Sequence, residues 1–341
     1  MIIYFIALSF VSLLSGCNAV GFGCGKPSPP SLDELDEFNP PIVFACIFHH
    51  KQPEISLYQS DNNDSMSDLL KALDNGKDLS LYFMGFGDKL SVTNGLSYQF
   101  CSGWCDVSAT NICRIYHSRK IESTSSIVKL RSLIKKALFN RRLEFVSRKV
   151  GDFVLDIRNQ CKIDKKKKKN KKCIEHMSQI NVHGFSLGSH AGAFFCRYMN
   201  EKIQEKCPLL IGYDPAELHP WLDQSKYIQK GDAEFVQLIH TSGVLGTRLR
   251  IGDVDVSVKY KSSLHFADNH FMGFRIQELS TSKRFAFIAN RNGPGSVIKL
   301  KNPKEFESIK SKLKKDQCLL GVVNNNVGKF RITITDKDLK A

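Results

Sequence analysis

Short apolar runs alternate along the chain with longer segments whose apolar residues recur at helical spacing. Apolar runs of roughly four to eight residues predict buried strands, and apolar positions three and four apart predict helices with one buried face. The strand-length runs are Ile42–Phe48, Leu79–Met84, Ala109–Tyr116, Ile180–His183, Pro208–Tyr213 and Ala233–His240. The segments with helical spacing are Met66–Leu73, Ser126–Leu138, Leu143–Cys161 and Ser189–Asn200. This alternation predicts an α/β fold, with a mainly parallel central sheet and helices on both faces.

The amino-terminal segment differs from the rest of the chain. Residues 1–15 form an apolar run too short to span a bilayer comfortably, and small residues follow at Gly16, Cys17 and Ala19. This pattern predicts a signal peptide over residues 1–19 and a secreted protein. An uncleaved anchor and a lipoprotein signal at Leu14–Cys17 are the alternatives. We expect a proline-containing irregular segment over 20–40, one folded domain over 41–336 and a short tail over 337–341.

The cysteines fit an exported protein. Of the 11 cysteines, all but Cys17 follow residue 19, which leaves an even number and predicts disulfides. Cys46 and Cys196 lie inside apolar segments and are the best candidates for buried thiols. Cys161 and Cys173 flank a lysine-rich run, so they could pair with each other or with unrelated partners. No cysteine pair has the CxxC spacing of a zinc site, and we expect no structural metal.

The charge is strongly positive, with a formal net value of +15. Much of the excess lies in Lys165 to Lys172, where a run of like charges predicts a solvated, self-repelling loop. A basic surface attracts phospholipid headgroups, sulfated glycans or nucleic acid. No RNP, zinc-finger or zipper pattern accompanies it, so we expect no specific nucleic-acid partner, and contact with an anionic surface or glycan stays open.

The sequence Gly184-Phe185-Ser186-Leu187-Gly188 fits G-x-S-x-G, with an apolar strand before it and a helix after it. In this turn the residues two before and two after the serine come so close that only glycine fits. The serine hydroxyl is then exposed at a helix amino terminus, where amide groups favour developing negative charge. The alternative is a glycine-rich turn with a chance serine. We predict that Ser186 is a nucleophile.

A serine nucleophile needs a histidine to take its proton and a carboxylate to orient that histidine. In α/β-hydrolases the chain order is serine, acid, histidine. Asp214 ends the next apolar strand and is the expected acid, although it could instead cap the turn before Pro215. The histidines that follow Asp214 are His219, His240, His265 and His270. A loop position after the last core strands favours His265 or His270.

Three successive motifs closely resemble those of the animal pancreatic-lipase family, which includes phospholipases A1. They are His183–Gly192, Gly212–Glu217 and Asp232–Thr241, and weaker likeness extends over Leu81–Phe86 and Gly328–Thr335. The resemblance implies the α/β-hydrolase fold with the catalytic domain alone, and it carries the family's triad onto Ser186 and Asp214.

The resemblance also selects among the histidines. Gly273 and Ser280 follow His270 at the family's spacing, which favours His270 over His265, although Asp268-Asn269 replace the family's cysteine and serine before it. By the same comparison, His190 and His240 are structural hydrogen-bonding residues. From its place before the serine turn, His183 is expected to be a strand residue.

A hydrolase of this kind needs two backbone N–H groups to stabilise the oxyanion. The resemblance assigns them to Leu187, directly after the nucleophile, and Phe86, after the strand at Leu79–Met84. Relatives usually have histidine where this chain has Met84. No metal or cofactor is needed for this acyl-transfer chemistry.

The family's triglyceride lipases carry a long cysteine-bounded lid before the catalytic histidine. Here the segment from Ile251 to His270 is short and has no cysteine. The resemblance therefore favours phospholipase A1 over a neutral triacylglycerol lipase. A catalytically silent lipase-like binding or storage protein is the rival from another class. Such proteins typically lose the serine or histidine, whereas this chain has all three triad residues.

Overall fold

The core of the protein is a single sheet that collects all twelve strands of the described residues. The computed structural model describes residues 41–48, 54–85, 110–117, 141–167, 171–218, 224–261, 266–281, 284–322 and 326–339. The strands are β1 Val43–Ile47, β2 Ile55–Gln59, β3 Leu79–Phe83, β4 Asn111–Tyr116, β5 Ile180–Phe185, β6 Leu209–Tyr213, β7 Val236–His240, β8 Val254–Tyr260, β9 Phe285–Asn290, β10 Ser296–Lys299, β11 Gln317–Leu319 and β12 Gly328–Ile334.

Strand directions confirm the mainly parallel sheet. The order is β10-β9-β12-β8-β7-β6-β5-β3-β4-β1-β2, with β11 paired to β9. From β4 to β12 through the centre, every neighbouring pair is parallel. Antiparallel pairs occur only toward the two edges, where β1 joins β2 and β4 and where β9 joins β10, β11 and β12. The parallel centre aligns the carboxyl ends of β3, β5, β6 and β7 along one edge.

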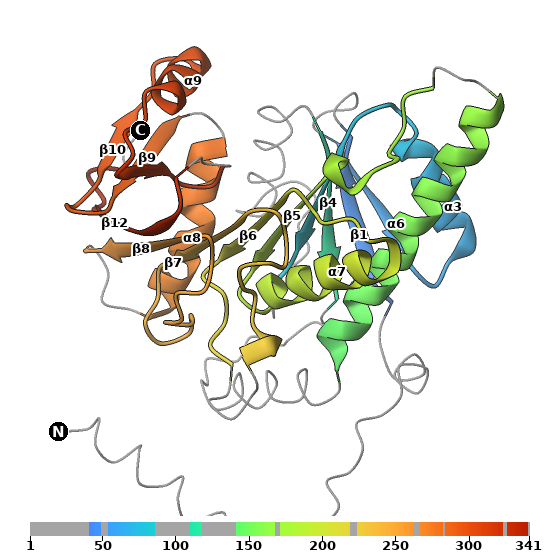
Figure 1. The fold of residues 1–341 in the computed structure, drawn as a ribbon, viewed down its shortest axis with the longest axis horizontal. Coiled ribbons are helices and arrows are strands. Elements are labelled where there is room, and N and C mark those ends of the chain that lie inside the picture. The colour runs from blue at the N-terminus through green and yellow to red at the C-terminus, as the bar shows by residue number, and fades with distance from the viewer. Residues whose placement is uncertain are drawn as a thin grey trace, which may run out of the picture.

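Helices cover both faces of this sheet, as Figure 1 shows with α6 and α7 in front and α8 behind. The α-helices are α3 Asn63–Leu73, α6 Arg142–Lys167, α7 Leu187–Ile203, α8 Phe266–Thr281 and α9 Pro303–Ser311, and short 3-10 helices span Met177–Gln179 and Gln224–Lys226. Alternate residues of β3 enter the two layers: Leu81 and Phe83 pack on the α6–α7 side, and Tyr82 packs with Phe274 of α8. This alternation follows from the two-residue period of a strand.

The expected elements are present wherever the structure describes them, with changed boundaries. The strand expected over Ala233–His240 begins at Val236, because Asp232 accepts the Gln229 N–H in a turn and pairs with Arg197 instead of joining the sheet. The expected helix over Ser189–Asn200 extends to Leu187–Ile203. The signal peptide, the irregular segment over 20–40 and the expected helix over Ser126–Leu138 lie outside the described residues.

Two expectations about cysteines and lysines were wrong. Cys46 is not a thiol: its strand β1 lies directly beside β4 in register with Cys113, and the two residues form a disulfide. Cys196 is a buried thiol, as expected. The lysine run is not simply a loop, since α6 continues to Lys167 and a second disulfide joins Cys161 to Cys173. Lysine is a good helix former, and cations at a helix carboxyl terminus interact favourably with its dipole.

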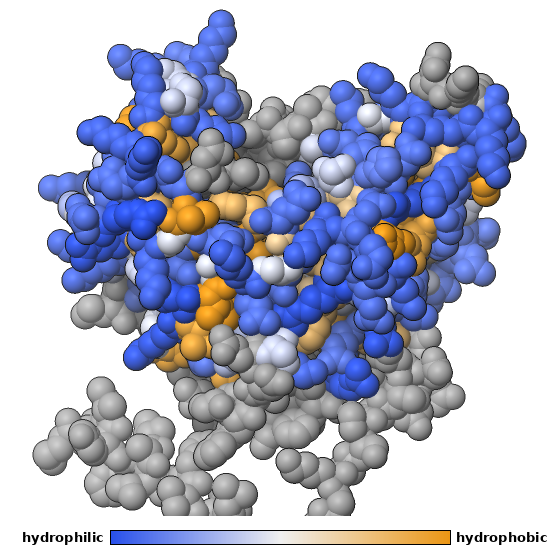
Figure 2. Space-filling view, in the orientation of Figure 1, coloured by the Kyte–Doolittle hydropathy of each residue, from blue (hydrophilic) through white to orange (hydrophobic). Residues whose placement is uncertain are grey.

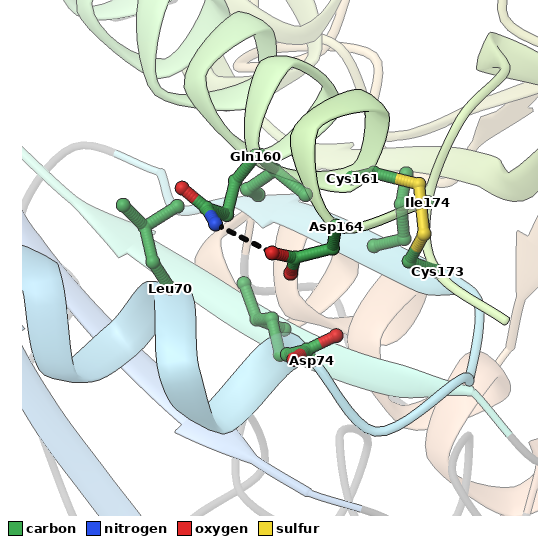
Figure 3. Close-up of a pocket in the computed structure, with 9 residues that line it drawn as sticks. Leu70, Asp74, Gln160, Cys161, Asp164, Cys173 and Ile174 are labelled. Carbon is green, nitrogen blue, oxygen red and sulfur yellow. Dashed lines mark hydrogen bonds between the residues drawn. A yellow bond between two sulfur atoms is a disulfide. The ribbon is translucent and has the colours of Figure 1, made fainter. Parts of the chain in front are cut away.

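Ion pairs fix the return of the chain beside this disulfide. Lys165 pairs with Glu175, and the Lys171 Nζ lies 2.5 Å from Asp74 Oδ2 and 2.6 Å from Asp164 Oδ2. Figure 3 shows Asp74 and Asp164 on facing sides of a small pocket next to the disulfide. The pocket floor is apolar, with Leu70, Leu73, Ile157 and Ile174. No helix within the described ranges has the length and apolar character needed to cross a membrane.

Candidate active site

Ser186 lies in a strained turn between β5 and α7. Its backbone has φ +53°, a region that side-chain-bearing residues rarely adopt. A Cβ at Gly184 would lie 2.3 Å from the Gly188 carbonyl oxygen, and one at Gly188 would lie 2.1 Å from the Phe83 carbonyl oxygen. The Ser186 N–H donates to the Tyr213 carbonyl of β6 at 3.0 Å. Glycine is therefore required on both sides of the serine, as the spacing indicates.

Asp214 follows β6, the neighbour of β5, and its carboxylate is completely buried. Its Oδ1 accepts the Thr241 N–H at 2.8 Å and the Ser242 N–H at 3.0 Å. A Cβ at Gly246 would lie 2.3 Å from the same oxygen, so the loop after β7 packs directly on the carboxylate. The alternative role of Asp214, capping the turn before Pro215, is not what its side chain does.

His270 presents its ring to that carboxylate from the opposite side. The distance from Nδ1 to Asp214 Oδ2 is 2.6 Å. Because a carboxylate only accepts hydrogen bonds, Nδ1 carries the proton and Nε2 is left as a base. The His270 ring also packs on Phe185, the residue before the serine, with ring centroids 4.6 Å apart. These contacts bring Ser186, Asp214 and His270 together at the carboxyl ends of β5 and β6.

The loop position expected for His270 was wrong, because His270 lies in α8. Apolar residues at Met272, Ile276 and Leu279 recur at helical spacing and are buried against the sheet. This pattern is the signal that could have located the helix. The other candidates differ: His219 and His265 lie outside the described residues, while His240 bonds to Asp255.

Ser186 is 9% exposed and His270 is 6% exposed, so both side chains keep slight access to solvent. Among the hydrogen bonds of the described residues, none joins the Ser186 hydroxyl to His270. Catalytic hydrogen bonds are often long before substrate binds. The arrangement can supply a nucleophile, a base and an orienting carboxylate.

Of the two expected oxyanion donors, the structure describes Leu187 but not Phe86. Leu187 is the first residue of α7 and is fully buried. Phe86 lies outside the described residues. The chain leading to it is fixed at Met84, whose carbonyl accepts a hydrogen bond from His117 Nε2 at 3.0 Å. Burial lowers the pKa of His117 to about 4, which keeps the ring neutral near pH 7.

Several contributors to the site carry no motif of their own. Thr241 and Ser242 act through backbone N–H groups, and the Thr241 hydroxyl also donates to the His270 carbonyl at 3.4 Å. A backbone N–H donor can belong to almost any residue type, so the sequence does not indicate it. The Ser242 side chain gives a weak signal, because its Oγ accepts the N–H groups of Leu245 and Gly246 and organises the turn.

The histidines read as structural are hydrogen-bonded core residues. His183 lies in β5 beside the Tyr213 hydroxyl at 3.1 Å, and His190 bonds to the Ala216 carbonyl at 2.9 Å. Burial lowers the pKa of His183 to about 3 and that of His190 to about 4. Among the residues that the structure describes, no group of three or more His, Cys, Asp or Glu side chains could hold a metal ion.

Comparison with known proteins shows a family similarity over part of the chain. The lipase family model matches residues 143–259, which include Ser186 and Asp214. Phospholipase A1 of Vespula vulgaris is 42% identical over 82 residues, 23% of this chain and 24% of the relative. Phospholipase A1 of Polybia paulista is 38% identical over 89 residues, 25% of this chain and 27% of the relative. Each match thus spans about a quarter of the relative's length.

A solved dienelactone hydrolase-like promiscuous phosphotriesterase aligns over 72% of this chain and 79% of its own, with 11% identity and a TM-score of 0.31. A TM-score this low gives no further support for the fold, which the sheet shows directly. The family match and the two relatives agree with each other and with the strand, serine turn and helix at Ser186. Over residues 143–259 the chain is therefore similar to the lipase and phospholipase A1 branch of the pancreatic-lipase family.

Proposed function

We propose that the protein is a secreted serine carboxyl-ester hydrolase that acts on lipids as a phospholipase A1. The observation that carries the proposal is the contact of 2.6 Å between His270 Nδ1 and the buried Asp214 carboxylate, beside a serine in a strained strand-to-helix turn. This contact leaves His270 Nε2 as the base that a serine nucleophile requires. Residues of these three types, in this chain order, perform acyl transfer in α/β-hydrolases.

The proposed reaction has two steps. Ser186 Oγ attacks the ester carbonyl while His270 Nε2 takes its proton, and the same histidine then returns the proton to the departing alcohol. Asp214 stabilises the imidazolium formed in between. The N–H of Leu187 and that of Phe86 are the proposed donors to the oxyanion. Water then attacks the acyl-enzyme, again with His270 as base, and releases the fatty acid.

The short chain between β8 and α8 supports phospholipid as the substrate. β8 ends at Tyr260 and α8 begins at Phe266, so only residues 261–265 lie between them. A short connection leaves an open site, which suits a phospholipid in a surface. Exposed apolar side chains near the site, Phe271 beside His270 and Val244 after the Asp214-binding amides, suit contact with acyl chains. The relatives named phospholipase A1 point the same way.

Secretion is supported by the two disulfides, which persist in oxidising compartments. A basic surface for anionic partners is also part of the proposal. Lys162, Lys166, Lys167 and Lys172 are exposed at the end of α6 and the return beside it. Figure 2 shows hydrophilic side chains gathered over this end of α6.

The test uses phosphatidylcholine and triolein as parallel substrates, with products identified by mass spectrometry. Free fatty acid together with 2-acyl lysophospholipid is the expected result, and Ser186→Ala should abolish it. Turnover of triolein alone would contradict the phospholipase A1 activity and identify the protein as a neutral lipase. Folded protein that turns over neither substrate, and does not react with an active-site phosphonate, would favour the silent lipid-binding protein.

A further inference from the structure

A second buried histidine–aspartate pair joins β7 to β8. His240 is the last residue of β7 and Asp255 the second residue of β8, and each is 3% exposed. His240 Nε2 lies 2.9 Å from Asp255 Oδ1. The other ring nitrogen, Nδ1, lies 2.9 Å from the Thr247 carbonyl oxygen. The proposed acyl transfer does not use either residue.

The hydrogen-bond partners of His240 determine how many protons its ring holds. A carbonyl and a carboxylate can only accept, so each ring nitrogen must donate, whereas a neutral imidazole has a single N–H. Asp255 is stabilised as an anion, because its Oδ2 also accepts the Gly252 N–H at 3.2 Å. With Asp255 ionised, two donating nitrogens between two acceptors make the ring an imidazolium.

His190 provides the contrast within the same molecule. Its Nε2 lies 2.9 Å from the Ala216 carbonyl, but its Nδ1 accepts the Ile228 N–H at 3.1 Å. One proton therefore satisfies the ring, and burial lowers the pKa of His190 to about 4. Two buried histidines in this core thus have opposite hydrogen-bond requirements.

The His240–Asp255 pair forms hydrogen bonds to the backbone of the loop 241–252 at two positions. His240 precedes the loop and its ring holds the Thr247 carbonyl, while Asp255 holds the Gly252 N–H at the far end. The first two residues of the loop, Thr241 and Ser242, give their N–H groups to Asp214. The position of the Asp214 carboxylate therefore depends on a loop that the buried pair keeps in place.

We propose that His240 is a buried imidazolium paired with Asp255, and that the pair positions the Thr241 and Ser242 amides against Asp214. Both are positioning residues, because they act through Asp214 and touch no substrate. A buried ion pair adds little net stability compared with apolar residues of the same size, so we assign it a geometric role. The kinetic consequence rests on the proposed function, whereas the protonation state does not.

Arg250 is a further charged group in this region, and it interacts electrostatically with both Asp255 and Asp214. Arg250 is held in the loop by a hydrogen bond from its Nη2 to Ser257 Oγ at 2.8 Å. Burial lowers the pKa of Arg250, and the two carboxylates oppose that shift.

The direct test is NMR of the full chain labelled with nitrogen-15 at histidine. Long-range proton–nitrogen correlations report which ring nitrogens carry a proton, and His240→Gln and His190→Gln spectra assign the two signals. At pH 7 we expect both nitrogens of His240 to be protonated and only one nitrogen of His190. A His240 ring with one bare nitrogen would overturn the proposal, and this measurement needs no destabilised variant.

The kinetic test compares Asp255→Asn, His240→Gln and the double variant on a soluble monomeric ester. Each single change should lower kcat by about tenfold or more and alter KM by less than about twofold, since a small misplacement of Asp214 weakens the base. The double variant should be no slower than the worse single variant, because the two residues act as one unit. An unchanged kcat in Asp255→Asn would refute the positioning role.

Asp232→Asn is the matched control. Asp232 is 6% exposed, pairs with Arg197 at 2.7 Å and precedes the opposite end of β7. This variant should lose stability and keep kcat. A wild-type protein without esterase activity would refute the proposed function instead. The amide proton shifts of Thr241 and Ser242 would then decide the positioning role: they should move in Asp255→Asn but not in Asp232→Asn, and unmoved shifts would refute it.

Discussion

Glycines, which have no Cβ, allow the close backbone contacts around Ser186 and Asp214. The carbonyl oxygens of Phe83 and Gly188 occupy the space that a Cβ would take at Gly188 and Gly184. The Asp214 carboxylate occupies the corresponding space at Gly246. At these positions even a methyl group must displace backbone or the proposed catalytic acid.

Gly246→Ala should therefore lower kcat by about a hundredfold with the fold intact, because its Cβ would lie 2.3 Å from Asp214 Oδ1. Hydrolysis of a soluble ester measures the effect. Gly243→Ala is the control in the same loop, since its Cβ would come no closer than 3.5 Å to the flexible Arg248 side chain. Equal activity of the two variants would contradict the packing described for Asp214.

Side-chain motifs made part of the site predictable. Ser186 and Asp214 were predicted as site residues because a glycine-flanked turn and an acid after an apolar strand are local patterns, and the prediction of His270 needed family spacing in addition. Thr241, Ser242 and His117 were missed. Their contributions depend on backbone amides or on a carbonyl contact across the fold, such as that between His117 and Met84.

At the scale of elements, β1 and β3 to β7 were predicted from their apolar runs, whereas β2 and β8 to β11 were missed. β5, β6 and β7 are buried on both faces and read as continuous apolar runs. β8 was not predicted as a strand, because polar residues alternate with its valines. Edge strands β2 and β10 have no buried residue, so their apolar signal is weak.

Buried histidines on these elements predict a pH-dependent stability. Burial lowers the pKa values of His117 and His190 to about 4 and that of His183 to about 3, below the reference of 6.5. The unfolded chain binds these protons first, so stability is complete above about pH 6.5 and is lost as the pH falls toward about 4.

Urea unfolding at a series of pH values measures this loss. In His190→Gln the free energy of unfolding should fall less steeply between about pH 6.5 and 4 than in wild type, because one of the three neutral histidines is gone. Parallel curves for the two proteins would show that His190 does not contribute.

The disulfide Cys161–Cys173 joins residues 12 apart in sequence. Removing it by Cys161→Ala with Cys173→Ala should cost about 3 kcal/mol of unfolding free energy, as expected for a loop of this size. The activity of the folded protein should not change, since Ser186 lies at the other end of β5. Lost activity in folded protein would contradict this separation, and urea unfolding with an ester assay tests both points.

At the scale of the whole molecule, the basic surface and the proposed active site lie at opposite ends of the parallel strands. Gln179, directly before β5, donates to the Cys173 carbonyl at 3.3 Å and to Asp78 at 3.1 Å, and Asp78 directly precedes β3. Ser186 follows the other end of β5. The sequence alone did not reveal this arrangement, because it depends on the direction in which α6 crosses the sheet (Figure 1).

This separation predicts that anion binding and ester hydrolysis are independent. Lys166→Glu with Lys167→Glu should weaken salt-sensitive binding to heparin, because both side chains are exposed, and leave hydrolysis of a soluble ester unchanged. The salt concentration at which the protein elutes from heparin measures anion binding, and the rate of ester hydrolysis measures activity. Unchanged elution would remove these lysines from the proposed anionic surface.

In the proposed mechanism Ser186 is a nucleophile that His270 and Asp214 activate and that the substrate acylates. Intact-protein mass spectrometry after reaction with an active-site phosphonate tests it most directly. We expect one added phosphonyl group on wild type, located at Ser186 by peptide mapping, and none on Ser186→Ala. Folded wild-type protein that stays unlabelled, or is labelled at another residue, would contradict the account.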